Sequence, residues 1–122
     1  MEEAKIKILV AEDNEFNMAY LEEVLSMLGY DIVKAVNGVE ALELFNQYPD
    51  IKLCLLDVKM PEMNGYDLAF AIRDINPDIP LIAQTAYALD FEQARYNSAF
   101  DAYITKPIKK ENLVSTLNQY LK

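Results

Sequence analysis

Five polar residues stand where apolar stretches of the sequence end, namely Glu12, Asp13, Asp57, Thr85 and Lys106. Short apolar runs such as residues 53–56 are typical of strands that are covered on both faces, as in a parallel sheet. In open α/β sheets, ligands bind at the edge formed by the carboxyl ends of the strands. We therefore expect these five side chains, although distant in sequence, to gather at one edge of a sheet.

The three acids of this set predict a cation site. Carboxylates that converge repel one another unless a cation joins them. The chain has no histidine, and its one cysteine, Cys54, lies inside an apolar run. Ligands made of oxygen alone favour Mg²⁺, with Mn²⁺ or Ca²⁺ as substitutes. A lysine and a threonine hydroxyl beside such a metal are suitable donors to a phosphoryl group, and an aspartate can itself act as the nucleophile.

Each residue also has an ordinary structural explanation. Glu12 or Asp13 can cap a helix, Asp57 can cap the loop that follows it, Thr85 can simply end a strand, and Lys106 can be a solvated surface residue. The prediction of a site therefore depends on all five occurring together, each at the end of an expected strand.

The elements that position these residues alternate regularly along the chain. We expect strands at residues 6–11, 30–36, 53–56, 81–84 and 101–105, and helices at about residues 16–28, 39–48, 66–75, 90–99 and 110–121. The expected helix at 90–99 has the weakest apolar periodicity. This alternation predicts one domain over residues 1–122, a doubly wound five-stranded parallel sheet between two layers of helices. The flavodoxin-like strand order 2-1-3-4-5 would make Asp13 and Asp57 neighbours.

Composition narrows the function classes. The net charge is −9, from 20 acidic and 11 basic residues, which argues against direct nucleic-acid binding. No stretch approaches the roughly 20 apolar residues of a membrane span, so we expect no membrane contact by this segment. The N-terminus, Met1-Glu2-Glu3, lacks the basic region of a signal peptide, and we expect a cytoplasmic location. Without histidine, Ser-His-Asp catalysis is excluded.

Several motifs together resemble the receiver domain of two-component response regulators, from Ile6 to about Leu121. They are VAEDN at 10–14, LDVKMP at 56–61, MNG at 63–65, QTA at 84–86 and YITKP at 103–107. The opening Glu12-Asp13-Asn14, followed by Asn17, is most similar to receivers of hybrid sensor histidine kinases.

The resemblance implies a role for each matching residue. Asp57 would accept a phosphoryl group from a phosphohistidine on a histidine kinase or a histidine phosphotransfer protein. Glu12, Asp13, Asp57 and the main-chain carbonyl of Lys59 would hold Mg²⁺. The domain would thus be a phosphoacceptor, with self-catalysed phosphotransfer and autodephosphorylation as its only chemistry, and not an enzyme in its own right.

The resemblance also implies a conformational switch. Thr85 and Lys106 would contact the phosphoryl oxygens, and Tyr103 would change exposure as Thr85 moves toward the phosphate. The peptide bond between Lys106 and Pro107 would be cis. The face formed by the fourth helix, the fifth strand and the fifth helix would then repack, and the same face is a candidate surface for a homodimer.

Three positions refine the pattern. Gln84 stands where an apolar residue is more usual, and its long side chain either alters how the fourth strand packs or reaches solvent. Lys59 and Tyr87, two residues beyond Asp57 and Thr85, stand where the family tunes the lifetime of the phosphoryl group. We expect the Tyr87 ring to shield the site from water.

Three alternative functions are compatible with a sheet of this kind. A phosphatase resembling the haloacid dehalogenase family would need a second acid two residues after Asp57, where this chain has Lys59. A flavin-binding domain would need a phosphate-binding loop after the first strand, where Glu12 and Asp13 would repel the cofactor. A pseudo-receiver that serves as a binding scaffold without phosphorylation is disfavoured by the complete set of acids together with Thr85 and Lys106.

Overall fold

The computed structural model describes residues 5–93 and 97–121. Its five strands form one parallel sheet in the order β2-β1-β3-β4-β5. The strands are β1 (Lys7–Ala11), β2 (Asp31–Ala35), β3 (Ile51–Asp57), β4 (Leu81–Thr85) and β5 (Ala102–Thr105). The predicted strand order is therefore confirmed, and β3, which ends in Asp57, lies at the centre of the sheet.

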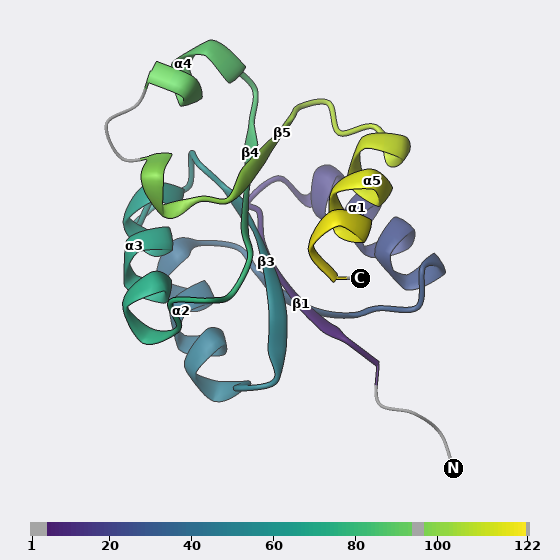
Figure 1. Cartoon of the computed structure of the whole chain (residues 1–122), viewed down its shortest axis with the longest axis horizontal. Helices are drawn as coiled ribbons and strands as arrows, with labels where there is room; N and C mark the ends of the chain where they lie inside the picture. Colours follow the sequence, from purple (N-terminus) through teal and green to yellow (C-terminus); the bar gives the residue numbers. More distant parts are fainter. Residues whose placement is uncertain (1–4, 94–96, 122) are drawn as a thin grey trace.

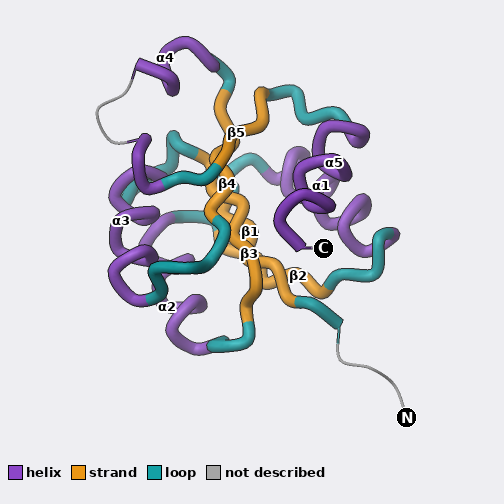
Figure 2. The backbone as a smooth tube through the Cα atoms, in the orientation of Figure 1, coloured by secondary structure: helices purple, strands orange, loops and turns teal. Residues whose placement is uncertain are grey.

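Helices cover both faces of this sheet, in three layers (Figure 1). They are α1 (Glu15–Met27), α2 (Gly38–Gln47), α3 (Gly65–Ile75), α4 (Ala88–Gln93) and α5 (Lys110–Leu121), with a short 3₁₀ helix at Asn97–Ala99. Figure 2 shows α2 and α3 on one side of the strands and α1 and α5 on the other. The doubly wound, flavodoxin-like architecture is thus confirmed. No helix within residues 5–93 and 97–121 has the length and apolar character to cross a bilayer.

Two apolar clusters hold the layers together. The first joins the sheet to α2 and α3 and includes Leu56, Leu68 and Ile72, while the second joins it to α1 and α5 and includes Leu25 and Leu113. β3 contributes to both clusters, because its apolar run is buried on both faces, as the unalternating sequence predicts.

Cys54 is fully buried within this central strand, and burial raises the pKa of its thiol. It packs as a small apolar residue in the first cluster, which agrees with its position in an apolar run.

The prediction of one helix over residues 90–99 was wrong. α4 begins two residues earlier, at Ala88, and residues 97–99 form a 3₁₀ helix, while residues 94–96 lie outside the described residues. Arg73 of α3 donates hydrogen bonds to the carbonyl of Ala99 (2.8 Å) and to the carboxylate of Asp101 (2.9 Å). These contacts fix the segment before β5 against α3, so tertiary structure overrides the helix propensity of its alanines.

The loops around the carboxyl ends of β1 and β3 are set by asparagine and glycine. The Asn14 side chain caps α1 by accepting a hydrogen bond from the Asn17 N–H (2.9 Å). Asn64 caps α3 in the same way, and Gly65 follows it. A Cβ on Gly65 would lie 2.3 Å from the main-chain oxygen of Asp57 and 2.7 Å from the Cα of Val58. Glycine is therefore required where α3 begins against the end of β3.

We predict that Gly65→Ala lowers the free energy of unfolding by about 1–3 kcal/mol, because the added methyl group overpacks rigid main chain. The amide resonances of residues 57–59 should shift as the loop moves. Gly29→Ala is the matched control. Gly29 has φ of 90°, so alanine should cost about 1–2 kcal/mol there, but those resonances should not shift. Urea unfolding and amide NMR spectra measure both effects. Unchanged stability in Gly65→Ala would contradict the close approach.

Candidate functional site

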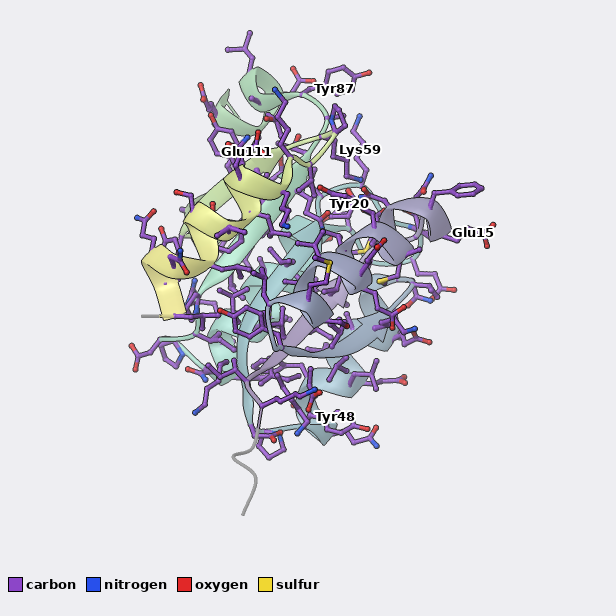
Figure 3. The ribbon with its side chains drawn as sticks, turned by 90° about the vertical axis from the view of Figure 1, so that its right-hand side faces the viewer. Glu15, Tyr20, Tyr48, Lys59, Tyr87 and Glu111 are labelled. Atoms are coloured by element: carbon purple, nitrogen blue, oxygen red, sulfur yellow. The ribbon has the colours of Figure 1, made fainter. Side chains whose placement is uncertain are left out.

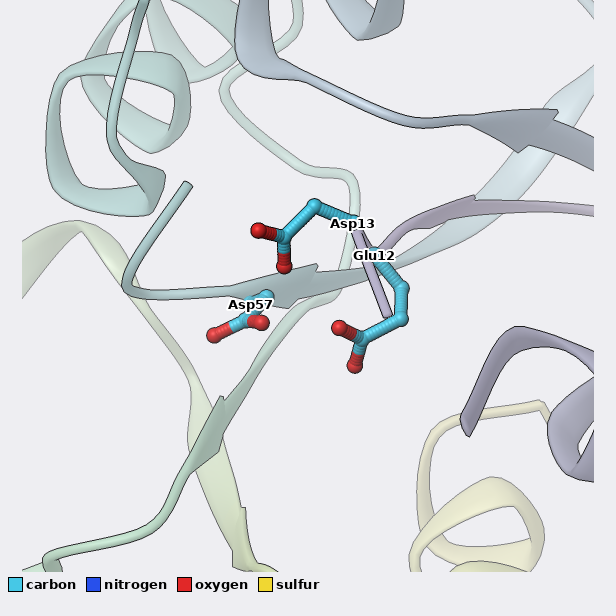
Figure 4. Close-up of side chains that lie close together, drawn as sticks. All are labelled: Glu12, Asp13 and Asp57. Atoms are coloured by element: carbon cyan, nitrogen blue, oxygen red, sulfur yellow. The ribbon is translucent and has the colours of Figure 1, made fainter. Parts of the chain in front are cut away.

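Three carboxylates meet at the carboxyl edge of the sheet. One oxygen from each of Glu12, Asp13 and Asp57 lies within 4.8 Å of the others (Figure 4). Glu12 and Asp57 are only 1% and 4% exposed, whereas Asp13 is exposed. Because Asn14 caps α1, neither Glu12 nor Asp13 is used as the helix cap. The strand order places these acids together, as the sequence predicts.

Lys106 provides a positive charge between two of these acids. Its ammonium nitrogen lies 2.8 Å from Asp57 Oδ2 and 3.1 Å from Glu12 Oε1, and its peptide bond to Pro107 is cis. Burial lowers the pKa of Lys106, but the hydrogen bonds and charges of Asp57 and Glu12 outweigh it, so the pKa is raised overall. Three carboxylates and one ammonium carry a formal charge of −3 + 1 = −2, which matches one divalent cation.

A cavity of about 260 Å³ contains the site and is lined by all five residues that the sequence predicts, together with Lys59 and Tyr87. The Lys59 N–H donates a hydrogen bond to Asp57 Oδ1 (3.0 Å). Asp57 is therefore held through one oxygen by main chain and through the other by the Lys106 ammonium. A carboxylate fixed in this way has a defined orientation toward the cavity.

Thr85 lines the same cavity, but its hydroxyl group is bonded locally. It donates to the carbonyl of Tyr87 (3.2 Å) and accepts from the Tyr87 N–H (3.1 Å). Contact between this hydroxyl and a group bound at Asp57 would therefore compete with the turn at Thr85–Tyr87.

Lys59 and Tyr87 stand at the mouth of the cavity. The Lys59 ammonium lies 5.2 Å from the centre of the Tyr87 ring, within range of a cation–π interaction. Figure 3 shows both side chains at the same end of the molecule. Tyr87 is 60% exposed, so its ring flanks the entrance and is not packed in the core.

Tyr103 lies outside this cavity. Its hydroxyl donates a hydrogen bond to Glu92 of α4, and its ring centre lies 5.0 Å from that of Phe91. The hydrogen bond to Glu92 is the main cause that raises the pKa of Tyr103, and desolvation raises it further. The ring is 36% exposed, and it connects β5 to α4.

Sequence reasoning missed the environment of Glu12. The side-chain amide of Asn17 donates to Glu12 Oε1, and the Asn14 N–H donates to Glu12 Oε2 (3.1 Å). Gln84 is fully buried, so it does not reach solvent, and its Oε1 lies 3.5 Å from the Asn17 amide nitrogen. The available signal was the unusual glutamine in an otherwise apolar strand.

Comparison with known proteins decides the family. The sequence profile described as response regulator receiver domain matches residues 8–118 of the chain. The chain belongs to the response regulator receiver domain family.

The relatives of this receiver domain include a protein of about the same length and a much longer one. Polar-differentiation response regulator DivK of Brucella anthropi is 34% identical, over 93% of the chain and 94% of DivK. Hybrid signal transduction protein dokA of Dictyostelium discoideum is 38% identical over 94% of the chain, but the match spans only 7% of dokA.

A solved structure of another receiver domain has the same fold. The receiver domain of sensor histidine kinase PA1611 from Pseudomonas aeruginosa PAO1 has a TM-score of 0.89 and 29% identity, over 97% of this chain and 98% of that one. That structure has a magnesium ion coordinated in its active-site cleft.

We predict that Lys106→Met lowers the free energy of unfolding in metal-free buffer by about 1–2 kcal/mol. Removing one partner of a fully buried ion pair costs more than this. The loss is smaller here because the lysine is partly solvated. Lys34→Met is the control. It removes an ion pair to Glu22 (3.0 Å) in which both side chains are nearly half exposed, and it should cost less than about 0.5 kcal/mol. Urea unfolding in EDTA compares the two, and equal losses would contradict the electrostatic role of Lys106.

Proposed function

We propose that this receiver domain accepts a phosphoryl group on Asp57 and acts as a signalling module of a two-component phosphorelay. The observation that carries the proposal is the position of Asp57. Its carboxylate is buried, it is held by Lys106 at 2.8 Å, and it has two further acids within 4.8 Å. The donor would be a phosphohistidine on a histidine kinase or a histidine phosphotransfer protein, and residues 1–122 would act as one receiver domain.

The chemistry requires little beyond position and charge. A carboxylate oxygen of Asp57 attacks the phosphorus, the new O–P bond forms as the N–P bond of the phosphohistidine breaks, and the imidazole leaves with the electron pair. The Lys106 ammonium already lies beside Asp57 and balances charge on the transferred group. In this proposal the domain is a phosphoacceptor and not an enzyme that turns over a separate substrate.

A divalent cation fits the residues present. Glu12, Asp13, Asp57 and the main-chain carbonyl of Lys59 would hold Mg²⁺, because the donors are hard oxygens and the site has a formal charge of −2. Mn²⁺ has a similar ligand preference and would substitute. When bound, the metal supplies positive charge that offsets the phosphoryl oxygens. The magnesium ion in the cleft of the PA1611 receiver supports this assignment.

The signal would leave the site through Thr85 and Tyr103. A phosphoryl group on Asp57 offers the Thr85 hydroxyl an acceptor that competes with its bonds to Tyr87. Movement of Thr85 would change the packing of Tyr103 against α4, and so shift the population of two conformations of the α4–β5–α5 face. This face would bind the output partner or a second copy of the chain, in the cytoplasm and without direct contact with nucleic acid.

We predict that Asp57→Asn abolishes labelling by acetyl phosphate in Mg²⁺, because the amide cannot form the acyl phosphate. Intact-mass spectrometry would measure one added phosphoryl group in the wild type and none in the variant. Asp50→Asn is the control, since Asp50 pairs with Lys7 at a different place on the molecule, and it should label normally. Label on Asp57→Asn would overturn the assignment, and an unlabelled wild type would favour the scaffold alternative.

We predict that Tyr87→Ala shortens the lifetime of the phosphoryl group several-fold. Loss of the ring that flanks the cavity would give water easier access to the acyl phosphate. Tyr87→Phe keeps the ring and its contact with Lys59, so it should decay at the wild-type rate. The decay of the labelled protein after removal of acetyl phosphate gives both rates. Equal decay in Tyr87→Ala and wild type would rule out shielding by this ring.

A further inference from the structure

A pair of side-chain amides connects the buried acid Glu12 to strand β4. Asn17 lies in the first turn of α1 and donates its amide N–H to Glu12 Oε1. The same amide nitrogen lies 3.5 Å from Gln84 Oε1. Glu12 and Gln84 are 1% and 0% exposed, whereas Asn17 between them is partly exposed, so the connection bridges α1 and the sheet at the border of the interior.

The charge of Glu12 fixes the orientation of both amides. An ionised carboxylate only accepts hydrogen bonds, so Asn17 must present its nitrogen to Glu12. That nitrogen then faces Gln84, and Gln84 in turn must present its oxygen. Rotating the Gln84 amide by half a turn would place two N–H donors against each other.

This orientation leaves a donor of Gln84 without a partner. Its Nε2 is buried and has no hydrogen-bond partner among the residues that the structure describes. An unpaired buried donor reduces stability, and an apolar side chain of similar length would avoid that cost. The orientation of Gln84 therefore serves Asn17 and Glu12 and leaves one buried N–H donor unsatisfied.

Gln84 also lies directly between two parts of the proposed phosphorylation site. It precedes Thr85 in β4 and pairs in register with Asp57 of β3. Its carbonyl accepts a hydrogen bond from the Val58 N–H (3.1 Å). A change in the position of Glu12 can thus reach β4 through Asn17 and Gln84.

We propose that Asn17 and Gln84 are positioning residues of the metal site, an inference that rests on the proposed function. Asn17 holds the Glu12 carboxylate in place for the cation, and Gln84 holds Asn17. Gln84 therefore acts on the cation only through Asn17, and the pair links occupancy of the metal site to the strand that carries Thr85.

The test compares Asn17→Ala, Gln84→Met and the double variant in the full chain. Mg²⁺ affinity is measured by isothermal titration calorimetry, and stability by urea unfolding in EDTA. Loss of a residue that orients a metal ligand costs at least roughly 10-fold in metal affinity, and we expect Asn17→Ala to show about this loss. Gln84→Met should weaken Mg²⁺ binding less. The double variant should bind like Asn17→Ala, because Gln84 acts through Asn17.

Stability separates positioning from simple packing. Gln84→Met removes the unpaired donor while keeping the side-chain length, so its unfolding midpoint in EDTA should equal or exceed that of the wild type although Mg²⁺ binds more weakly. Ile82→Val is the matched control, because Ile82 is buried two positions earlier on the same strand. It should lower the unfolding midpoint and leave Mg²⁺ affinity unchanged.

Three outcomes would overturn the inference. Wild-type Mg²⁺ affinity in both single variants would remove the positioning role, and an additive loss in the double variant would show that Gln84 does not act through Asn17. A lower midpoint for Gln84→Met with unchanged Mg²⁺ affinity would reduce Gln84 to a packing residue. If the wild type itself bound no Mg²⁺ and accepted no phosphoryl group on Asp57, the proposed function would fail together with this inference. Failure of the inference alone would leave Mg²⁺ binding and phosphorylation of the wild type intact.

Discussion

The site depends on the repulsion between carboxylates that the fold forces together. Two of the three acids are nearly inaccessible to solvent, so water cannot screen them effectively. Lys106 offsets part of this repulsion by contacting both Glu12 and Asp57. The remaining negative charge makes the cavity attractive to a cation, and a phosphoryl group becomes acceptable there only when positive charge surrounds it. In the proposed function, metal binding and phosphoryl transfer would therefore be coupled through the same few atoms.

The fold meets this constraint with precise main-chain placement at the strand ends. Asn14 caps α1, which leaves the two preceding acids for the site. Gly65 lets α3 begin against the main chain of Asp57. The Lys59 N–H and the Lys106 ammonium hold different oxygens of that carboxylate. Each of these residues lies just beyond the end of a strand or at the start of a helix, while the strands supply rigidity.

The helical layers and the gathering of five polar residues could be predicted from the alternation of apolar segments, and the strand order could be predicted from the flavodoxin-like fold that this alternation suggests. The expected helix at 90–99 was wrong, because a contact from Arg73, far away in sequence, decides the structure before β5. The environment of Glu12 was missed for a related reason. Sequence alone marks Gln84 as unusual, but only the packing of α1 on the sheet shows that its amide faces Asn17. Side-chain orientation across elements is set by tertiary structure and has no local signal.

The burial of Cys54 has a consequence for how this domain responds to oxidants and electrophiles. A thiol reacts with oxidants and electrophiles as the thiolate and when it is accessible. This one is enclosed in the central strand, and its pKa is raised, so both requirements fail. Since the chain has no other cysteine, thiol oxidation has no accessible target in this sequence, although Asp57, the proposed phosphoacceptor, lies only three positions further along the same strand.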